Sequence, residues 1–318
     1  MNKDTKTECM KGGVNMLEVV LPGTGGTVPR KDRWLASCYM RFGGSGLLID
    51  CGEGTQIALK EAGITMKPID VLCLTHYHAD HASGIPGFLL TMGNEGREDP
   101  LTVIGPRGLE TVLRGLLVVG APSFPIRMYE VDETNPMPIA LGDYVIEPFA
   151  LDHGIPCLGY RVSIERAGKF DPEKAKRNGV PMAYWSRLQK GESIEGADEI
   201  YTPDMVLGAP RRGLSVTYAT DTRPIPIISE MARDGDLLIC EGMYGDPEKD
   251  ARAREAHHML YRDAATLAKN AGVDRLWLTH YSPSMKEPEE FLAGEAQSIF
   301  ENTVCGFDGM RDTLRFRD

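Results

Sequence analysis

The most constraining feature of this sequence is a dense cluster of potential metal ligands directly after an apolar run. Residues 75–81 read Thr-His-Tyr-His-Ala-Asp-His, and the apolar residues before them are typical of a buried strand. Because alternate side chains of an extended backbone point the same way, His76 and His78 can reach one ion. Asp80 and His81 then turn the other way and can serve a second ion. Imidazoles with a few carboxylates are the ligand set that suits zinc.

Other residues at strand ends add to this set. The chain has only seven histidines, and two of them, His153 and His280, follow strand-like runs. Asp221 also ends such a run. Each residue alone would more often be a cap or a turn residue. Together with the cluster at 75–81 they supply the separated ligands that a two-metal site requires.

Short strand-like runs alternate with helical patterns through both halves of the chain. We expect strands at 17–21, 36–41, 47–50, 71–75, 101–104, 126–130, 236–239 and 275–278. We expect helices at 54–62, 82–92 and 107–117. A further amphipathic helix is predicted where five apolar residues share one face: Leu260, Ala264, Leu267, Ala268 and Ala271. This alternation predicts α/β layering.

Composition narrows the class of protein further. Of the 318 residues, 42% are hydrophobic and 25% charged, which suits a globular protein with a substantial core, and no apolar run reaches the length of a membrane span. The net charge of −11 excludes a generic, salt-driven nucleic-acid binder but leaves room for a local basic patch. The seven cysteines are scattered and form no C-x-x-C pair, which favours a reducing cytoplasm.

The N-terminal residues lack any structural periodicity. Met16 directly precedes the first strand-like run, and residues 11–13, Lys-Gly-Gly, can be encoded by a sequence that reads as a ribosome-binding site. We therefore interpret residues 1–15 as a disordered extension, with a flexible tail and a misassigned start codon as equal alternatives. The domain itself is expected to span residues 16–318.

One segment carries a charge opposite to that of the rest. Residues 161–190 contain eight basic and three acidic residues, a net charge of +5, which leaves −16 on the remainder of the chain. This asymmetry should attract anions, although an ordinary solvated helix is the simpler alternative.

The sequence contains the H-x-H-x-D-H pattern at 76–81, the run Asp-Cys-Gly-Glu-Gly-Thr-Gln at 50–56 and the loop Pro-Arg-Lys-Asp-Arg at 29–33. With these motifs it resembles the metallo-β-lactamase superfamily and, within it, the ribonuclease Z family of tRNA 3′-end endonucleases. The H-x-H-x-D-H pattern at 76–81 is specific for hydrolases of the superfamily. Residues 50–56, Asp-Cys-Gly-Glu-Gly-Thr-Gln, are similar to a ribonuclease Z motif, and the likeness continues at 84–87. The loop 29–33 is similar to the P-x-K-x-R loop near the substrate of this family. The resemblance covers most of the chain up to about residue 285.

The resemblance implies an α/β fold for residues 16–318, the αββα four-layer sandwich of the metallo-β-lactamase type. Residues 168–181 are similar to the start of the arm that grips tRNA in this family, so the segment of about 161–200 is expected to form a protruding basic arm. Bacterial members are commonly dimers, which implies a homodimer here.

The resemblance also implies two Zn²⁺ ions, with Mn²⁺ or Fe²⁺ as alternatives. One ion would be held by His76, His78 and His153, and the other by Asp80, His81 and His280, with Asp221 as the bridge. Two ions about 3.5–4 Å apart can act on the attacking and leaving oxygens of a phosphodiester. Substrate contacts are expected from Lys31, Arg33 and Lys169.

The resemblance assigns proton chemistry to three further positions. Asp80 would orient or deprotonate the attacking water, and His258 would protonate the leaving ribose oxygen. Glu241 would orient His258 and raise its pKa. The alternative is that His257 and His258 form an exposed helix start. Replacement of His257 by alanine is expected to have almost no effect on the rate.

Four departures from the family bear on the substrate. Cys240 stands where the family has a histidine, Trp34 where it often has an asparagine, and Met259 and Leu260 where it has small hydroxyl residues. The glycine–proline-rich tip of the arm is replaced at 181–185, where Tyr184 and Trp185 could stack on bases or pack against a partner subunit.

Three functions therefore remain open. The leading interpretation is a dinuclear zinc phosphodiesterase that acts on precursor tRNA. A hydrolase of a small phosphodiester, sulfate ester or lactone is the enzymatic alternative. A metal-stabilised regulatory or binding protein is the alternative without turnover, and it would bind metal without cleaving RNA or generic phosphodiesters.

Overall fold

The computed structural model describes residues 16–196 and 199–317, so the predicted extension at 1–15 lies outside the described residues. These residues form two compact units. Unit 1 combines the described residues up to Ser163 with Ser215–Arg315, and unit 2 comprises Ile164–Leu214 with residues 316 and 317. Strands β9 (Leu158–Arg166) and β12 (Arg211–Ala219) carry the chain from one unit into the other and back.

Unit 1 contains two seven-stranded sheets. The first has the order β16-β1-β2-β3-β4-β5-β6, with β1 (Met16–Gly23), β2 (Ser37–Phe42), β3 (Ser45–Ile49), β4 (Ile69–Cys73), β5 (Leu101–Pro106), β6 (Ile126–Val131) and β16 (Met310–Arg315). The second has the order β15-β14-β13-β12-β9-β8-β7, with β7 (Ile139–Leu141), β8 (Tyr144–Ala150), β13 (Leu237–Glu241), β14 (Leu276–Thr279) and β15 (Thr303–Cys305). The run β3 to β6 and the run β12 to β15 are parallel.

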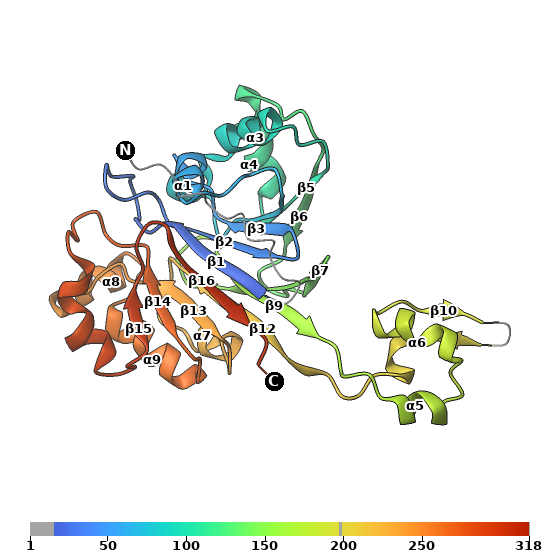
Figure 1. The fold of residues 1–318 in the computed structure, drawn as a ribbon. Coiled ribbons are helices and arrows are strands. Elements are labelled where there is room, and N and C mark those ends of the chain that lie inside the picture. The colour runs from blue at the N-terminus through green and yellow to red at the C-terminus, as the bar shows by residue number, and fades with distance from the viewer. Residues whose placement is uncertain (1–15, 197–198, 318) are drawn as a thin grey trace, which may run out of the picture. The chain divides into compact units, whose positions relative to one another are not determined.

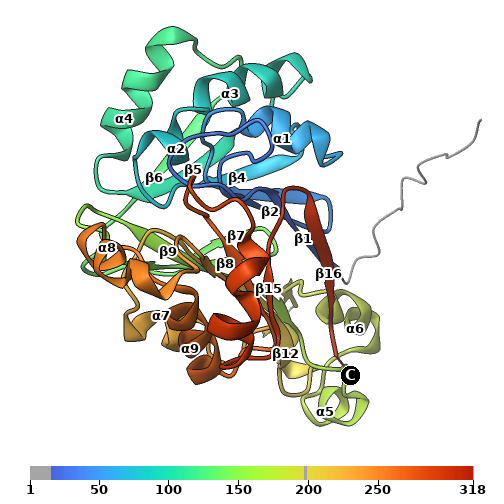
Figure 2. The ribbon, with the colours of Figure 1, turned by 90° about the vertical axis from the view of Figure 1, so that its left-hand side faces the viewer.

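Helices cover the outer faces of both sheets, as Figures 1 and 2 show. The first sheet is covered by α1 (Thr55–Glu61), α3 (Ile85–Asn94) and α4 (Leu109–Leu116), and η1 (Leu117–Val119) follows α4. The second is covered by α7 (Pro226–Met231), α9 (Tyr261–Ala271) and η5 (Leu292–Gln297), with η3 (Pro247–Lys249), α8 (Asp250–Glu255) and η4 (Pro288–Phe291) nearby in sequence. The predicted αββα sandwich is thereby confirmed.

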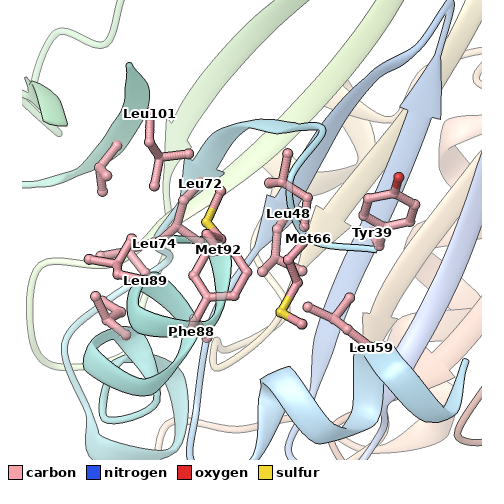
Figure 3. Packing of buried hydrophobic residues seen from close by; sticks show 14 of the residues in the cluster. Tyr39, Leu48, Leu59, Met66, Leu72, Leu74, Phe88, Leu89, Met92 and Leu101 are labelled. Carbon is pink, nitrogen blue, oxygen red and sulfur yellow. The ribbon is translucent and has the colours of Figure 1, made fainter. Parts of the chain in front are cut away.

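The apolar packing explains why the outer helices stay in place. Leu59, Phe88 and Met92 pack against Leu48 and Leu72 of the first sheet, all of them fully buried (Figure 3). On the second sheet the predicted apolar face of α9 is buried, and Gly272 ends that helix in a left-handed conformation. Burial of this kind is the main stabilising contribution to such a fold.

The helix predicted at 82–92 is present as α3, but it begins later, at Ile85. Ala82 instead ends a separate short helix, α2 (Ala79–Ala82), and the break between the two helices includes Gly84. A Cβ at Gly84 would lie 1.9 Å from the carbonyl oxygen of Gly52, so this close approach of two backbones requires glycine. The break places Asp80 and His81 in their own short helix.

Unit 2 has a small core of its own. It contains α5 (Pro172–Arg177), α6 (Met182–Gln189), β10 (Ile194–Glu195), β11 (Ile200–Tyr201) and η2 (Pro203–Met205). Tyr184 and Trp185 pack against its buried cluster, and the indole Nε1 of Trp185 donates to the carbonyl of Val180. These aromatic side chains therefore pack within their own unit, a third possibility that the sequence interpretation overlooked. Arg161, at the start of the predicted insert, lies in β9, and its guanidinium donates to the carbonyl of Met231.

The described part of the chain has no helix that is long and apolar enough to cross a membrane. Its six described cysteines are all buried and free of disulfides.

Candidate metal centre

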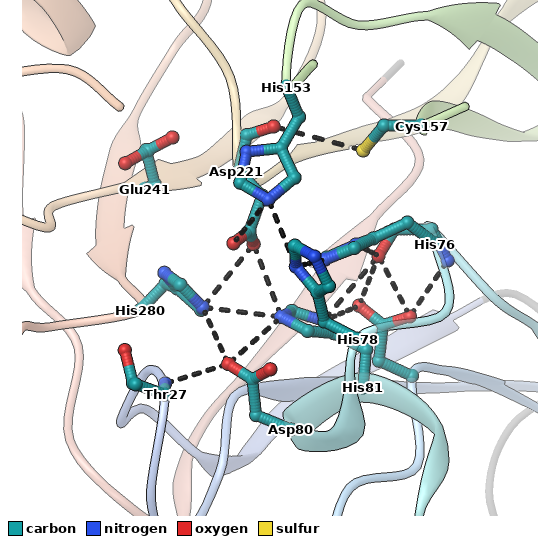
Figure 4. Close-up of polar contacts among 12 residues, drawn as sticks. Thr27, His76, His78, Asp80, His81, His153, Cys157, Asp221, Glu241 and His280 are labelled. Atoms are coloured by element: carbon teal, nitrogen blue, oxygen red, sulfur yellow. Dashed lines mark hydrogen bonds and ion pairs between the residues drawn. The ribbon is translucent and has the colours of Figure 1, made fainter. Parts of the chain in front are cut away.

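The predicted ligands meet at the carboxyl ends of the strands (Figure 4). His76 follows β4, Asp221 follows β12 and His280 follows β14, while His153 lies in the loop after β8. The helix α2 adds Asp80 and His81. Carboxyl ends of parallel strands are the usual place for a site in an open α/β sheet.

Four of these side chains have the spacing of ligands around one ion. The Nε2 atoms of His81 and His280 are 3.3 Å apart, and each lies 3.3 Å from Oδ2 of Asp221. They lie 3.4 and 3.5 Å from Oδ2 of Asp80. Ligand atoms around a tetrahedral ion with bonds of about 2.0–2.1 Å are about 3.3–3.4 Å apart. A divalent ion of this size therefore fits between the four atoms.

A second group lies beside the first. Nδ1 of His78 is 3.0 Å from Nε2 of His76 and 3.2 Å from Nε2 of His153. Oδ1 of Asp221 lies 3.8 Å from Nε2 of His153, while Oδ2 belongs to the first group. This buried Oδ2 has no hydrogen-bond partner among residues 16–196 and 199–317. A buried carboxylate oxygen normally has a partner, and a bound cation would supply it.

A buried carboxylate behind the ligands fixes their orientation. Oδ2 of Asp50 lies 2.8 Å from Nδ1 of His81, and both side chains are almost fully buried. The amide and hydroxyl of Thr75 donate to the same carboxylate, and the hydroxyl oxygen lies 3.0 Å from Nδ1 of His76. Such contacts leave Nε2 of each ring free to bind metal.

The loop before β2 also contacts the ligands. The backbone N–H of Thr27 donates to Oδ2 of Asp80 over 2.7 Å. A Cβ at Gly26 would lie 2.7 Å from the ring of His280, so only glycine allows the loop to approach this closely.

The electrostatics of the centre favour a cation. Burial lowers the pKa of His76 and of His153, which keeps both rings neutral as metal ligands must be. Burial also opposes a charge on His81, but the carboxylates of Asp221 and Asp50 outweigh it and raise the pKa of that ring. The centre therefore stabilises positive charge at this point.

His258 and Glu241 form a pair at the edge of the ligand cluster. Nδ1 of His258 lies 2.9 Å from Oε2 of Glu241, and the ring of His258 is centred 5.2 Å from that of His153. Burial opposes the imidazolium, yet the Glu241 carboxylate prevails and raises the pKa of His258 to about 9. Cys240 packs with its Sγ 3.8 Å from Sδ of Met259, so the absence of a histidine there leaves the pair intact.

Backbone strain is concentrated at this centre. Among the described residues, six other than glycine have a positive φ. Five of them are Thr27, Asp50, Asp221, His257 and His280. Such conformations are uncommon and tend to occur at functional sites, where the surrounding structure holds them.

The three predicted substrate residues have different surroundings. Lys31 is exposed on unit 1, and Lys169 is exposed on unit 2. The guanidinium of Arg33 donates to the carbonyl of Met285 and lies 5.2 Å from the centre of the Tyr281 ring. Arg33 therefore braces the loop that follows His280.

A cavity of about 460 Å³ lies next to that loop, and its lining includes Tyr244, Lys249, Ser282, Ser284, Lys286 and Phe291. The ring of Tyr244 is centred 6.5 Å from the ring of His258, so the cavity adjoins the centre. Its lining also contains the carboxylates of Asp246, Glu287 and Glu290, so the cavity carries charges of both signs.

Sequence reasoning missed several residues that hold the ligands. Asp50, Thr75 and Arg223 were given no role, although Asp50 begins the motif at 50–56 and directly follows β3. A carboxylate at a strand end beside the ligand motif was the available signal. Arg223, which donates through its backbone N–H to the carbonyl of Asp152, gave none.

Two facing sheets with outer helices and a His/Asp cluster at the strand ends define a protein of the metallo-β-lactamase fold. Human tRNase Z, short form, has a TM-score of 0.67 at 22% identity, covering 95% of this chain and 100% of that one. The metallo-β-lactamase fold protein YhfI from Bacillus subtilis has a TM-score of 0.68 at 18% identity, covering 94% and 100%. At these identities the likeness shows the fold alone.

Sequence relatives give the family. A protein named Ribonuclease Z from Lachnoclostridium phytofermentans is 51% identical over 302 residues, which cover 95% of this chain and 99% of the relative. Another protein with that name from Lachnospira eligens is 50% identical over 304 residues, covering 95% and 99%. The chain therefore belongs to the ribonuclease Z family. A family model described as Anti-Pycsar protein Apyc1 matches residues 17–121, about the first third.

Proposed function

We propose that this protein is a metal-dependent endoribonuclease that cleaves precursor tRNA at its 3′ end. The observation that carries the proposal is a complete ligand cluster in a chain about half identical, over nearly its full length, to proteins named Ribonuclease Z. The short form of human tRNase Z shares the fold.

The proposed centre holds two Zn²⁺ ions, with Mn²⁺ or Fe²⁺ as alternatives. His76, His78 and His153 would hold one ion, Asp80, His81 and His280 the other, and Asp221 would bridge them through its two oxygens. The second ion is supported by the distances of 3.3–3.5 Å from the His81 and His280 Nε2 atoms to Oδ2 of Asp221 and Oδ2 of Asp80. The first ion is supported by the close group of His76, His78 and His153. When bound, such ions act as Lewis acids toward a phosphodiester and its attacking water.

The residues around the ions would move and hold protons. Asp80 accepts from the amide of Thr27 and so presents a fixed carboxylate that can orient the attacking water. His258 is the proposed donor to the leaving ribose oxygen, because Glu241 keeps its ring charged near neutral pH. Glu241 is thus a positioning residue.

Substrate recognition is assigned to basic residues of both units. We infer contacts to RNA phosphates from Lys31 and Lys169, which are exposed, and from Arg33, whose guanidinium also donates to the carbonyl of Met285. The segment 161–200, with its excess of basic residues, would serve as an RNA-binding arm on a domain of residues 16–318. A cytoplasmic homodimer is part of the same proposal.

Side-by-side cleavage assays test this function. Zinc-loaded protein is incubated with a precursor tRNA and with bis(p-nitrophenyl) phosphate. We expect a single cut at the 3′ end of the tRNA domain. Hydrolysis of the small ester alone would favour the small-molecule hydrolase, and metal binding with neither reaction would favour a regulatory protein.

A further inference from the structure

One exposed ion pair joins two loops of the metal centre. Nδ1 of His257 lies 3.0 Å from Oδ1 of Asp152, and the two side chains are 45% and 48% exposed. Asp152 directly precedes His153, and His257 directly precedes His258. The pair therefore connects the loop of a proposed metal ligand with the segment of the proposed proton donor.

The backbone of His257 makes a second connection. Its carbonyl lies 3.5 Å from Nδ1 of His153. Because a carbonyl can only accept, this contact selects the tautomer in which Nδ1 of His153 carries the hydrogen. Nε2 then keeps its lone pair, and it is this atom that faces Nδ1 of His78 over 3.2 Å. A metal ligand held in this way binds more tightly than a free imidazole.

His257 occupies a position where glycine would be less strained. Its φ is +55°, and its ring lies 3.7 Å from where a Cβ on Gly154 would be, so it covers the loop after His153. An exposed ion pair contributes little to stability. His257 therefore has a strained backbone while its ring and its carbonyl both contact the loop of Asp152 and His153. This combination indicates that the residue serves the metal centre rather than overall stability.

We propose that His257 is a positioning residue that fixes the orientation of His153 and its distance from His258. Arg223 links the same two segments, since its backbone N–H donates to the carbonyl of Asp152 over 2.9 Å and its guanidinium donates to the carbonyl of His258. This inference rests on the proposed metal centre, and it assigns a role to a residue for which the sequence predicts none.

Three variants test the proposal. H257G keeps the left-handed backbone and the carbonyl but removes the ring. H257N places an amide N–H donor near the former position of Nδ1, and asparagine tolerates this positive φ. R252A is the control, because it breaks another exposed ion pair, with Glu255 on α8, that does not contact the ligand loops. For each zinc-loaded protein we measure the rate of metal loss to a chelator, and for each metal-free protein the melting temperature.

We expect H257G to lose zinc about tenfold faster or more, with an unchanged or higher melting temperature, and H257N to recover most of the difference. R252A should match the parent protein. D152A should act through the same contact, so combining it with H257G should add little. The role of His257 would be overturned if H257G retained zinc as long as the parent protein does, or if H257N gave no rescue. Additive effects of D152A and H257G would overturn it as well. A parent protein that binds no zinc would instead contradict the proposed function.

Discussion

Asp50 illustrates how a residue without direct contact to a metal can control the centre. Its carboxylate is fully buried, and burial raises its pKa, yet it lies 2.8 Å from Nδ1 of His81 and accepts twice from Thr75. A buried carboxylate with such partners makes the opposite nitrogen of the imidazole a stronger ligand. The ligand motif at 76–81 therefore depends on a residue that lies 31 positions before His81.

At the same scale, replacement of His258 tests its role as the proton donor. H258A should lower the rate of precursor tRNA cleavage by about 10²–10⁴-fold, because the leaving ribose oxygen needs a proton. The loss should be much smaller with bis(p-nitrophenyl) phosphate, whose leaving group hardly needs one. Bound metal, measured by elemental analysis, should stay unchanged. Equal losses on both substrates would refute the assignment.

Glu241 provides the pH dependence of the same step. The pKa of His258 is raised to about 9, so the acid form is present below that pH and is lost as the pH rises through it. The cleavage rate should therefore fall on the alkaline side. E241Q removes the charge 2.9 Å from the ring and should move this alkaline limb down by about one to three pH units. The pH–rate profiles of the parent protein and of E241Q measure this shift. An alkaline limb at the same pH in both proteins would show that Glu241 does not set the pKa of His258.

Among the elements, unit 2 can be removed most cleanly. Within it, a Cβ at Gly168 would lie 2.1 Å from the carbonyl oxygen of Gly208, so the chain segments that follow β9 and precede β12 are close enough there to join. Replacing residues 169–207 with a two-glycine turn removes the whole apolar cluster of this unit. Cleavage of precursor tRNA should be abolished, while hydrolysis of bis(p-nitrophenyl) phosphate should persist.

The parent protein is the control for this deletion. Its affinity for precursor tRNA should fall steeply with added salt, because basic side chains release phosphate counterions on binding. Unchanged RNA binding by the shortened protein, with metal content intact, would contradict an RNA-binding arm.

The elements also show what local patterns can predict. The strands β1, β4 and β14 and the helix α9 follow from short apolar runs and a clear helical period, which depend only on neighbouring residues. The break before α3 depends on contact between Gly84 and Gly52, which are distant in the sequence. Likewise the ligands could be predicted as residue types, whereas the contacts of His257 and Arg223 arise only when three loops meet.

For the whole molecule, metal binding should be linked to folding stability. The carboxylates of Asp80 and Asp221 lie close together with four histidines, and the pKa of each carboxyl is held well below its usual range by His280 and His81, against the opposing effect of burial. A cation that binds only the folded state adds stability by mass action. Removing it with a chelator should lower the melting temperature by about 5–10 °C. Calorimetry with and without zinc measures this, and an unchanged melting temperature would contradict the coupling.

The most direct test of a two-ion centre is the metal content of fully active protein. Asp221 presents one oxygen to each ligand group, with 3.8 Å to His153 and 3.3 Å to His81 and His280. Elemental analysis under saturating zinc should therefore give about two equivalents per chain, and D221A should lose both ions while a variant of His153 mainly weakens one. At most one equivalent in active protein would contradict the account.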